Sequence, residues 1–438
     1  MSAAASLPIV RADVRAMAEA AKKASRVMAG MDEAKRNAAL AAMAAAIEAA
    51  SAELLAANVL DLGGAAELSG ATLARLKLDK AKLAEMAEQV RSVAQLPDPL
   101  GHVLDAIELD EGLGLTKISV PLGVLAVIFE ARPDAVTQIA ALAIKSGNAV
   151  ILKAGKEVEG TAGVLVRALR EALVCQGLPA DAVSLLVGRE QTQELLGMHG
   201  LVDLVIPRGS KELVEYVQAN TRIPVLGHSE GVCHIYVDES ADEAVALRVI
   251  EDAKTDYPAA CNAVETVLVH RAIAAEFLPK LAERLRAKGV ALHGDDIVRE
   301  LLRGVEVEAV ADWHTEYGEL AVSLGVVNGL EEAIEHIHEH GSSHTESVIA
   351  EDKAVAERFL REVDAASVMH NASTRFADGF RYGFGAEVGI STSKLHARGP
   401  VGLEGLTTYK YVLRGHGQVA AEYRGENAKA FTHRREAR

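Results

Sequence analysis

Hydrophobic positions recur at helical spacing through the first part of the chain, up to about Leu96. Apolar residues, mostly alanine and leucine, alternate there with charged residues in the pattern of helices that bury one face. Polar residues that can begin helices and glycines that can end them are Asp32, Ser51, Asp79, Gly30, Gly63 and Gly64. We therefore expect three or four helices, closed by Pro97 and Pro99, before a short extended stretch over Gly112–Val120.

The pattern then changes to short apolar runs that alternate with amphipathic segments. The first run is apolar throughout, as a strand buried on both faces requires. The expected strands are Val124–Phe129, Ala149–Lys153, Val183–Val187, Asp203–Ile206 and Pro224–Leu226. The expected helices are Ala135–Lys145, Glu157–Gln176, Gln191–Met198 and Ser210–Ala219. Strands that alternate with helices predict a parallel sheet with right-handed crossovers.

A second series of the same kind begins after Gly231. Its expected strands are His234–Val237, Glu265–Val269, Val322–Val327 and Ser347–Ala350. Its expected helices are Ala241–Lys254, Ala272–Lys288 and Leu330–His340. The fold class is therefore α/β, with two parallel-sheet units of similar size. The stretch Arg375–Gly405 lacks periodicity and is expected to form ordered loops at a site or a linker, and Lys429–Arg438 is expected to fray.

Composition and charge exclude several classes of function. The 438 residues include 46 basic and 62 acidic ones, for a net charge of −16. A surface this acidic repels phosphate backbones and anionic lipids, so neither nucleic acid nor a membrane is an expected partner. We expect the first residues to form an alanine-rich helix and not a secretion signal. Three cysteines without paired spacing argue against a disulfide framework and a zinc site. We expect a cytoplasmic protein with no metal.

Cysteine offers the sharpest choice among candidate reactive residues. Cys175 falls on a long predicted helix and Cys233 begins an apolar strand, so both are expected to be small core residues. Cys261 falls in a loop of small residues that leads into a predicted strand, where a rigid frame can present a nucleophile. The local pattern alone leaves two roles open for Cys261, that of a nucleophile and that of a structural residue.

Two junctions between strand and helix could bind an anion. Lys153 and Lys156 flank a glycine at the end of a predicted strand, where ligands of open α/β sheets bind, although such lysines more often belong to a solvated turn. Gly209 and Ser210 precede a predicted helix whose free amides could hold a phosphate, although helix capping alone is the commoner role. Neither junction carries the glycine-rich dinucleotide fingerprint.

Four histidines form the densest titratable cluster in the sequence: His336, His338, His340 and His344. Their spacing lacks a carboxylate-bearing zinc motif, so we expect the solvated end of a helix here and no metal centre.

Several separate segments, in order, resemble the aldehyde dehydrogenase superfamily and, within it, the gamma-glutamyl phosphate reductase family. These segments are Val120–Pro133, Lys145–Lys153, Tyr257–Ala263, His340–Glu346, Phe384–Thr392 and His396–Pro400. The resemblance implies two Rossmann-like domains and an oligomerisation flap. The cofactor domain would comprise 1–100 and 121–231, the domain with the nucleophile 232–400, and the flap and tail 101–120 and 406–438. It also implies a homo-oligomer and a kinase partner, glutamate 5-kinase.

By this resemblance Cys261 is the nucleophile of an NADPH-dependent reduction of L-glutamyl 5-phosphate to L-glutamate 5-semialdehyde, in proline biosynthesis. A thiolate displaces phosphate and leaves a thioester that accepts hydride. Hydrolytic members carry a water-activating glutamate, and the matching position here is Gly227, with Glu230 only an offset substitute. A thioester that must survive until hydride arrives should lack such a base.

The resemblance also assigns cofactor residues. Lys153 matches the lysine that reaches the adenine ribose, and Gly209 and Ser210 match the helix start under the pyrophosphate. Glu316 matches the glutamate that holds the nicotinamide ribose. Lys156 replaces the glutamate that NAD-preferring members often place against the 2′-hydroxyl. A cation there favours the 2′-phosphate of NADPH.

The remaining candidates rest on charge type or on partial matches. Arg132 and Arg398 are candidates for the substrate α-carboxylate and Glu130 for the amine, with Arg375, Arg381 and Glu387 as further choices. The usual oxyanion asparagine falls at Ala131, so Asn262 and Asn371 are substitutes for the second donor beside the Cys261 backbone N–H. The rivals are a semialdehyde or acyl-CoA-linked dehydrogenase of the same fold, a cysteine hydrolase that needs a histidine at Cys261, and a scaffold without catalysis.

Overall fold

The structure, a computed structural model, describes residues 13–65, 67–68 and 70–435. The chain divides into two units: unit 1 comprises Met1–Leu226, Gly385–Val388 and Gly402–Arg438, and unit 2 comprises Gly227–Phe384 and Gly389–Val401. The passage between them thus falls at Leu226–Gly227, five residues before the expected boundary. The roles expected of the domains remain predictions.

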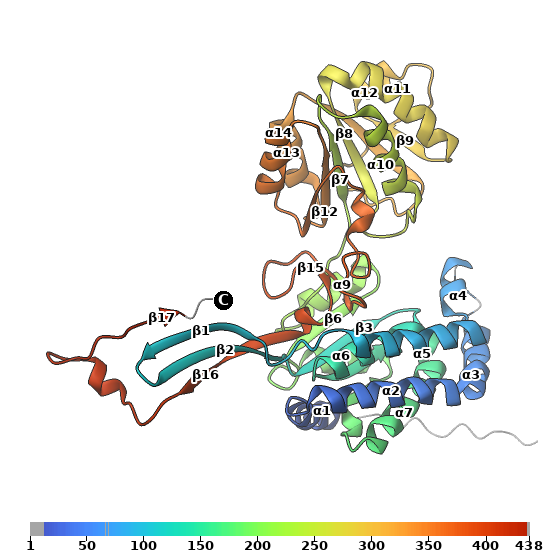
Figure 1. Cartoon of the computed structure of the whole chain (residues 1–438). Helices are drawn as coiled ribbons and strands as arrows, with labels where there is room; N and C mark the ends of the chain where they lie inside the picture. Colours follow the sequence, from blue (N-terminus) through green and yellow to red (C-terminus); the bar gives the residue numbers. More distant parts are fainter. Residues whose placement is uncertain (1–12, 66, 69, 436–438) are drawn as a thin grey trace, which may run out of the picture. The chain divides into compact units, whose positions relative to one another are not determined.

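Five helices open unit 1 (Figure 1): α1 (Val14–Met28), α2 (Glu33–Ala49), α3 (Ser51–Gly64), α4 (Gly70–Leu76) and α5 (Lys80–Gln95). The expected starts at Asp32 and Asp79 are confirmed, because each aspartate accepts a backbone N–H in the first turn of its helix. α2 packs on α5 and α7 through a core of small and aliphatic side chains, among them Leu40, Met43 and Ile47. Alanine therefore dominates here because it permits close helix packing as well as helix formation.

The first parallel sheet has four strands in the order β5-β4-β3-β6. They are β3 (Val124–Phe129), β4 (Ala149–Ala154), β5 (Val183–Leu186) and β6 (Leu204–Arg208). The connecting helices are α6 (Pro133–Lys145), α7 (Glu159–Cys175), α8 (Arg189–Leu196) and α9 (Lys211–Asn220). All six residues of β3 are buried, which confirms a strand covered on both faces. The fifth strand expected at Pro224–Leu226 is wrong: only an isolated bridge joins Val225 to Val205.

A second sheet of unit 1 is antiparallel and forms a long arm (Figure 1), with strand order β16-β2-β1-β17. Its strands are β1 (Val103–Asp110), β2 (Leu113–Pro121), β16 (Thr407–Arg414) and β17 (Arg434–Arg435). Segment 101–120 and the chain after Leu406, which the resemblance groups in one flap, lie in the same sheet, because β16 pairs with β2 in antiparallel register. The prediction that the chain end frays is wrong for Arg434 and Arg435, which pair with β1. Residues 436–438 lie outside the described residues.

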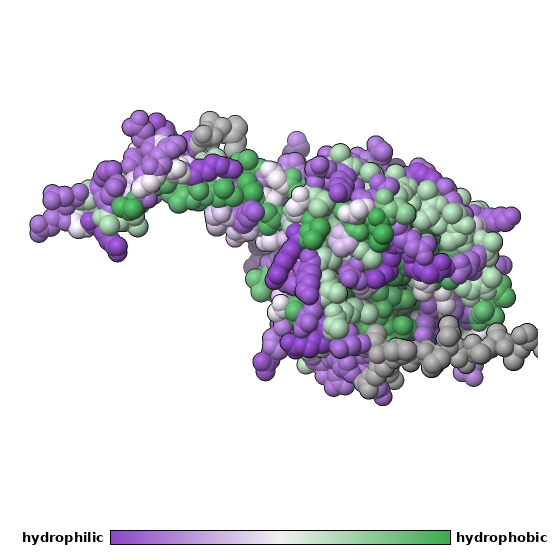
Figure 2. All heavy atoms as spheres, turned by 90° about the horizontal axis from the view of Figure 1, so that it is seen from below, coloured by the Kyte–Doolittle hydropathy of each residue, from purple (hydrophilic) through white to green (hydrophobic). Residues whose placement is uncertain are grey.

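Apolar side chains remain on the surface of this arm. Figure 2 shows hydrophobic residues gathered along it, and the exposed ones include Val103, Leu104, Tyr411 and Leu413. An exposed apolar sheet of this kind is typical of a surface that meets another protein chain.

Unit 2 is built on a seven-stranded parallel sheet of order β10-β9-β11-β8-β7-β12-β13. Its strands are β7 (Cys233–Val237), β8 (Val264–His270), β9 (Ala291–Gly294), β10 (Glu308–Ala309), β11 (Ala321–Val327), β12 (Thr345–Ile349) and β13 (Ser367–His370). Its helices are α10 (Glu243–Thr255), α11 (Arg271–Ala287), α12 (Asp296–Leu301), α13 (Leu330–His340) and α14 (Lys353–Glu362). The predicted helix Leu330–His340 is confirmed at both ends. Sequence reasoning missed β9, β10, β13 and α12, which are short, and the ten-residue helix α14.

The stretch Arg375–Gly405 consists of ordered loops, as expected, with a two-stranded sheet of β14 (Gly389–Ser391) and β15 (Gly399–Val401). Among the described residues, no single helix combines the length and the apolar character needed to cross a membrane. The bent pair α2 and α3 meets both criteria only when its two helices are taken together.

Candidate functional site

The predicted cofactor residues of unit 1 lie at the carboxyl ends of its parallel strands. Lys153 is half-buried near the carboxyl end of strand β4 and pairs with Ile128 of β3. Lys156 is exposed in the short 3-10 turn that follows. Gly209 and Ser210 follow β6, which pairs with the other side of β3. The structure therefore brings these four residues to one edge of one sheet, where ligands of open α/β sheets bind.

The start of α9 at this edge holds a carboxylate. Glu130, which follows β3, accepts a hydrogen bond from the Ser210 backbone N–H at 3.2 Å through Oε2. Ser210 also caps the helix, since its hydroxyl oxygen accepts from the Leu213 N–H. A side chain at Gly209 would collide with the Glu130 carboxylate, so glycine allows the close approach of an anion. Glu130, expected to bind the substrate amine, thus lies where the resemblance assigns a cofactor phosphate.

Arg132 lies in the same part of unit 1, at the start of α6. Its Nη2 atom is 3.4 Å from Asp134 Oδ2, and 43% of its side chain is exposed. The preceding residue, Ala131, has a φ of +47°, a left-handed conformation, and its N–H donates to Glu157 Oε1 at 2.6 Å. The turn after β3 is therefore held by a side chain from the turn after β4.

The candidate nucleophile belongs to unit 2. It lies at the amino ends of the parallel strands of that unit, whereas the cofactor residues of unit 1 lie at carboxyl ends. Cys261 is half-buried and comes three residues before β8 begins, and His228 and His344 precede β7 and β12. Cys261 Sγ and one ring nitrogen of each histidine lie within 4.8 Å of one another. Neither histidine was paired with Cys261 from the sequence, because 33 and 83 positions separate them from it and only the sheet order brings them together.

The other two cysteines differ from Cys261 in burial. Cys233 is fully buried, its Sγ–H donates to the Cys261 carbonyl oxygen at 3.3 Å, and burial raises the pKa of its thiol well above the usual value. It is a core thiol, as expected. Cys175 was wrongly expected in the core: it is exposed.

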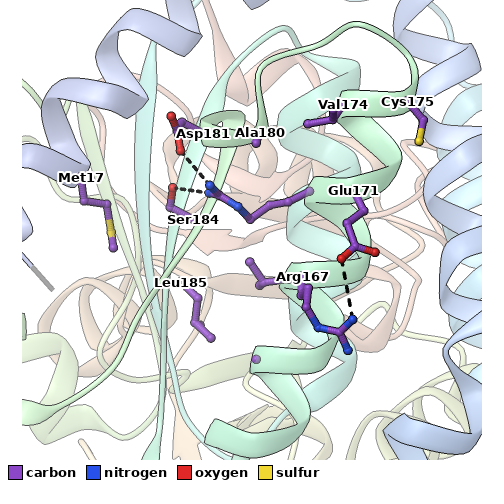
Figure 3. Close-up of a pocket in the computed structure, with 12 residues that line it drawn as sticks. Met17, Arg167, Glu171, Val174, Cys175, Ala180, Asp181, Ser184 and Leu185 are labelled. Carbon is purple, nitrogen blue, oxygen red and sulfur yellow. Dashed lines mark hydrogen bonds and ion pairs between the residues drawn. The ribbon is translucent and has the colours of Figure 1, made fainter. Parts of the chain in front are cut away.

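Cys175 lies with α7 residues at a pocket of about 800 Å³ beside the edge strand β5 (Figure 3). The charged side chains there are committed to local partners: Arg170 pairs with Asp181 at 2.9 Å, and Arg167 with Glu53 and Glu171. None of the residues that line this pocket is a predicted cofactor or substrate residue, so it is no candidate for the active site.

The loop that carries Cys261 is fixed from both sides. Asp256, at its start, accepts from Arg375 Nε at 3.1 Å and from Arg381 Nη2 at 3.0 Å. Hydrogen bonding from Arg381, together with that from Arg375, lowers the pKa of the Asp256 carboxyl. A side chain at Gly231 would collide with the Cys261 carbonyl. Arg375 and Arg381, weighed as substrate ligands, therefore brace the loop.

A buried ion pair lies near the same edge. Lys254 Nζ, at the end of α10, is 2.6 Å from Glu265 Oε2 in β8, and neither side chain is exposed. Burial lowers the pKa of Lys254 and raises that of Glu265 to about 7. Glu316 lies near enough to this pair for its charge to act on both groups. Sequence reasoning missed Lys254 and Glu265, which fall in ordinary helix and strand positions.

Three weaker candidates have contacts that bear on their expected roles. Asn371 follows β13 at the carboxyl edge of the sheet, the edge opposite Cys261, and both ends of its amide bind the Ala350 backbone. It is therefore wrong as an oxyanion donor. Asn262 donates to the Ala377 carbonyl at 2.9 Å, so one of its amide hydrogens is committed. Arg398 pairs with Asp364 at 2.8 Å, which provides its guanidinium with a carboxylate from its own unit.

The expectation of a solvated histidine cluster is also wrong for three of its four members. His336 packs edge-on against Trp313 at 4.8 Å and lies 4.5 Å from the ring of His340. Burial lowers the pKa of His336 to about 3 and that of His340 as well, and His344 is fully buried. Only His338 is exposed.

We expect His336→Leu to make the protein more resistant to acid. The unfolded chain protonates a histidine near pH 6.5, whereas folded His336 stays neutral until about pH 3, so acidification across this window favours unfolding. The native protein should lose up to about 1.4 kcal/mol per pH unit relative to the variant, less where solvent reaches the ring. Urea titrations of both proteins from pH 7 to 4 measure this difference. A constant difference across that range would contradict the assignment, and His338→Leu serves as the exposed control.

The chain is similar to known proteins in both sequence and fold. The aldehyde dehydrogenase family model matches residues 8–297. Gamma-glutamyl phosphate reductase of Cyanothece is 56% identical over 420 residues, which cover 95% of this chain and 97% of that protein. The enzyme of the same name from Natronomonas pharaonis is 52% identical, over 95% of this chain and 97% of its own length.

The crystal structure of gamma-glutamyl phosphate reductase from Thermotoga maritima superposes with a TM-score of 0.91 at 39% identity, covering 93% of this chain and all of that one. A glyceraldehyde-3-phosphate dehydrogenase from Methanocaldococcus jannaschii complexed with NADP shares the fold, with a TM-score of 0.64 at 16% identity over 92% of this chain and 94% of its own. This chain belongs to the aldehyde dehydrogenase family of oxidoreductases, and within it to the gamma-glutamyl phosphate reductases. The fold and the resemblance expected from the sequence are thereby confirmed.

Proposed function

We propose that this protein reduces L-glutamyl 5-phosphate to L-glutamate 5-semialdehyde with NADPH, releases phosphate, and acts in proline biosynthesis through a Cys261 thioester. The observation that carries the proposal is Cys261 itself: a half-buried thiol on a braced loop, in a chain of this family. Cys233 is buried with a raised thiol pKa and Cys175 lies on another unit, so neither is an alternative nucleophile.

The reaction requires a nucleophile with an oxyanion donor, a fixed loop and a hydride donor near Cys261. The thiolate attacks the acyl carbon and expels phosphate, and the Cys261 backbone N–H stabilises the oxyanion that forms. Asp256, Arg375 and Arg381 keep the loop in place during the attack. A bound nicotinamide would supply hydride to the thioester carbonyl. Collapse of the resulting thiohemiacetal releases the aldehyde and returns the thiol.

Loss of a water-activating base supports reduction over hydrolysis. The position that carries that glutamate in hydrolytic relatives is Gly227, which has no side chain to activate water. The acyl group on Cys261 then persists until hydride or phosphate reaches it. A hydrolytic semialdehyde dehydrogenase is correspondingly disfavoured.

The cofactor residues fit a dinucleotide phosphate. The start of α9 already receives a carboxylate, so its amides suit an anion, and a bound pyrophosphate would replace the Glu130 contact with Ser210. Lys153 and Lys156 would meet the adenine ribose and its 2′-phosphate, and Glu316 would hold the nicotinamide ribose. Arg132, Arg398 and Glu130 remain our candidates for the substrate's α-carboxylate and amine. The arm is our candidate for a homo-oligomer contact.

We expect Lys156→Glu to shift preference from NADPH towards NADH. The exposed ammonium of Lys156 would make one charge-assisted contact with the 2′-phosphate, worth about 1.5–3 kcal/mol, or roughly ten- to a hundredfold in affinity. Fluorescence titrations with both cofactors give the ratio, and Lys23→Glu, at another exposed lysine of unit 1, is the matched control. An unchanged ratio would mean that Lys156 does not meet the 2′-phosphate.

The reverse reaction tests the proposal as a whole. Glutamate semialdehyde and NADP⁺ should give steady NADPH formation only when phosphate, or arsenate in its place, is present to accept the acyl group. Acetaldehyde and succinate semialdehyde serve as substrate controls and should react poorly. Equal rates with and without phosphate would replace the proposal with a hydrolytic dehydrogenase.

A cysteine hydrolase is the second candidate, because His228 and His344 approach Cys261 closely. Such an enzyme would cleave activated glutamyl esters without any nicotinamide. Catalytic ester cleavage that needs no cofactor, without semialdehyde-dependent NADPH formation, would favour it.

A further inference from the structure

The group formed by Cys261, His228 and His344, here called the Cys–His–His cluster, has the chemistry of a metal site. All three residues lie at the amino edge of the unit 2 sheet, with one ligand atom of each within 4.8 Å of the others. One thiolate and two imidazoles form a donor set that Zn²⁺ prefers, and three protein ligands leave a fourth position open.

Each histidine is oriented in the way that metal-binding histidines usually are. His228 Nδ1 donates its hydrogen to the Ile390 carbonyl oxygen at 2.8 Å. His344 Nδ1 is 2.8 Å from the Thr345 hydroxyl oxygen. Metal-binding histidines usually make such a hydrogen bond through one ring nitrogen, and the bond fixes the orientation of the ring.

His344 provides an independent sign of a ligand. The residue is completely buried, and its Nε2 atom has no hydrogen-bond partner among the described residues. A buried ring nitrogen without a partner is unfavourable in a folded protein, and a cation bound to it would remove that penalty.

We propose that the Cys–His–His cluster binds one Zn²⁺ ion and that the bound ion reversibly inhibits the enzyme. Bond formation between Zn²⁺ and Cys261 Sγ releases the thiol proton to solvent, and the sulfur lone pair is then no longer available to attack an acyl phosphate. The inhibition rests on the proposed function, whereas the binding does not.

The geometry needs only a small adjustment. Ligand atoms around tetrahedral zinc are roughly 3.5 Å apart, given Zn–S and Zn–N bonds of about 2.3 and 2.0 Å. The cluster must therefore contract by about 1 Å at its widest. Cys261 and His228 lie in loops, where side-chain rotation suffices, while His344 is fixed against β12.

Cobalt titration of the full-length protein tests the binding. Co²⁺ in place of Zn²⁺ should give the visible bands of a tetrahedral ion and a near-ultraviolet thiolate-to-cobalt band, saturate at one ion per chain, and be displaced by Zn²⁺. Cys261→Ser should abolish the thiolate band, and His228→Gln should weaken cobalt binding about a hundredfold. Cys175→Ser and His338→Gln, matched changes at exposed residues outside the cluster, should alter neither. Circular dichroism checks that each variant is folded.

A thiolate band that survives Cys261→Ser, or no tetrahedral cobalt spectrum in the native protein, would overturn the proposal. An activity assay distinguishes three claims: metal binding at the cluster, inhibition by the bound metal, and the proposed function. Zn²⁺ should inhibit semialdehyde-dependent NADPH formation, and a chelator should restore it. A cobalt spectrum without any such activity would leave the metal site standing and remove the proposed function. Activity that Zn²⁺ cannot inhibit while cobalt binds at the cluster would remove the inhibition.

Discussion

Cys261→Ala should lower turnover at least about a thousandfold while NADPH still binds, because this change removes the only atom that forms the thioester and leaves the cofactor residues of unit 1 intact. The loop around residue 261 should hold its shape, since Asp256 and its two arginines and the Cys233 hydrogen bond to the backbone do not involve Cys261 Sγ. Steady-state rates and NADPH fluorescence, measured on the same preparation, separate the two effects.

The other cysteines provide the controls. Cys175→Ala changes an exposed residue of α7 and should keep full activity. Cys233→Ala removes one weak hydrogen bond to the Cys261 carbonyl and should keep most of it. A comparable loss of turnover in a folded Cys175 variant would contradict the assignment of Cys261.

Glu265→Gln should destabilise unit 2 by about 3–5 kcal/mol, since it leaves the completely buried Lys254 ammonium without its carboxylate. Both pKa directions already point to the unfavourable effect of burial on this pair: that of Lys254 is lowered and that of Glu265 is raised to about 7. Chemical denaturation followed by circular dichroism measures the loss.

A double replacement distinguishes the buried charge from lost packing. Lys254→Met together with Glu265→Leu should recover much of the stability, because no charge is then left unpaired. Glu243→Gln, which breaks the exposed pair with Lys280, is the matched control and should change stability by less than about 1 kcal/mol. If the stability lost in the double variant equals the sum of the losses from the two single replacements, the interaction between Lys254 and Glu265 is contradicted.

Most of the fold could be predicted because its signals are local. The buried run of β3 and the amphipathic period of α13 specify their elements within six and eleven residues. The short elements β9 and α12 carry too few residues for a period to emerge, and Pro224–Leu226 has an apolar strand pattern but forms only an isolated bridge. Strand order in unit 2 depends on long-range packing that no single segment contains.

The candidate site could be predicted only in part, for a related reason. Lys153, Lys156 and Ser210 follow strands whose ends are visible in the sequence, so their common edge follows from parallel topology. The proximity of His228 and His344 to Cys261 requires three strands to align at their amino ends. Arg375 and Arg381 were expected to bind substrate, but in the structure they bind Asp256. The sequence could not show this, because Asp256 becomes their neighbour only after folding.

A single-turnover experiment tests the central claim most directly. Native protein, NADP⁺ and glutamate semialdehyde are mixed in buffer free of phosphate and arsenate, and NADPH formation is followed before the protein is digested for peptide mass spectrometry. We predict one NADPH per active chain, then a stall, with a glutamyl group on the Cys261 peptide that added phosphate removes. Continued NADPH formation without phosphate, or an acyl group on another residue, would contradict the account.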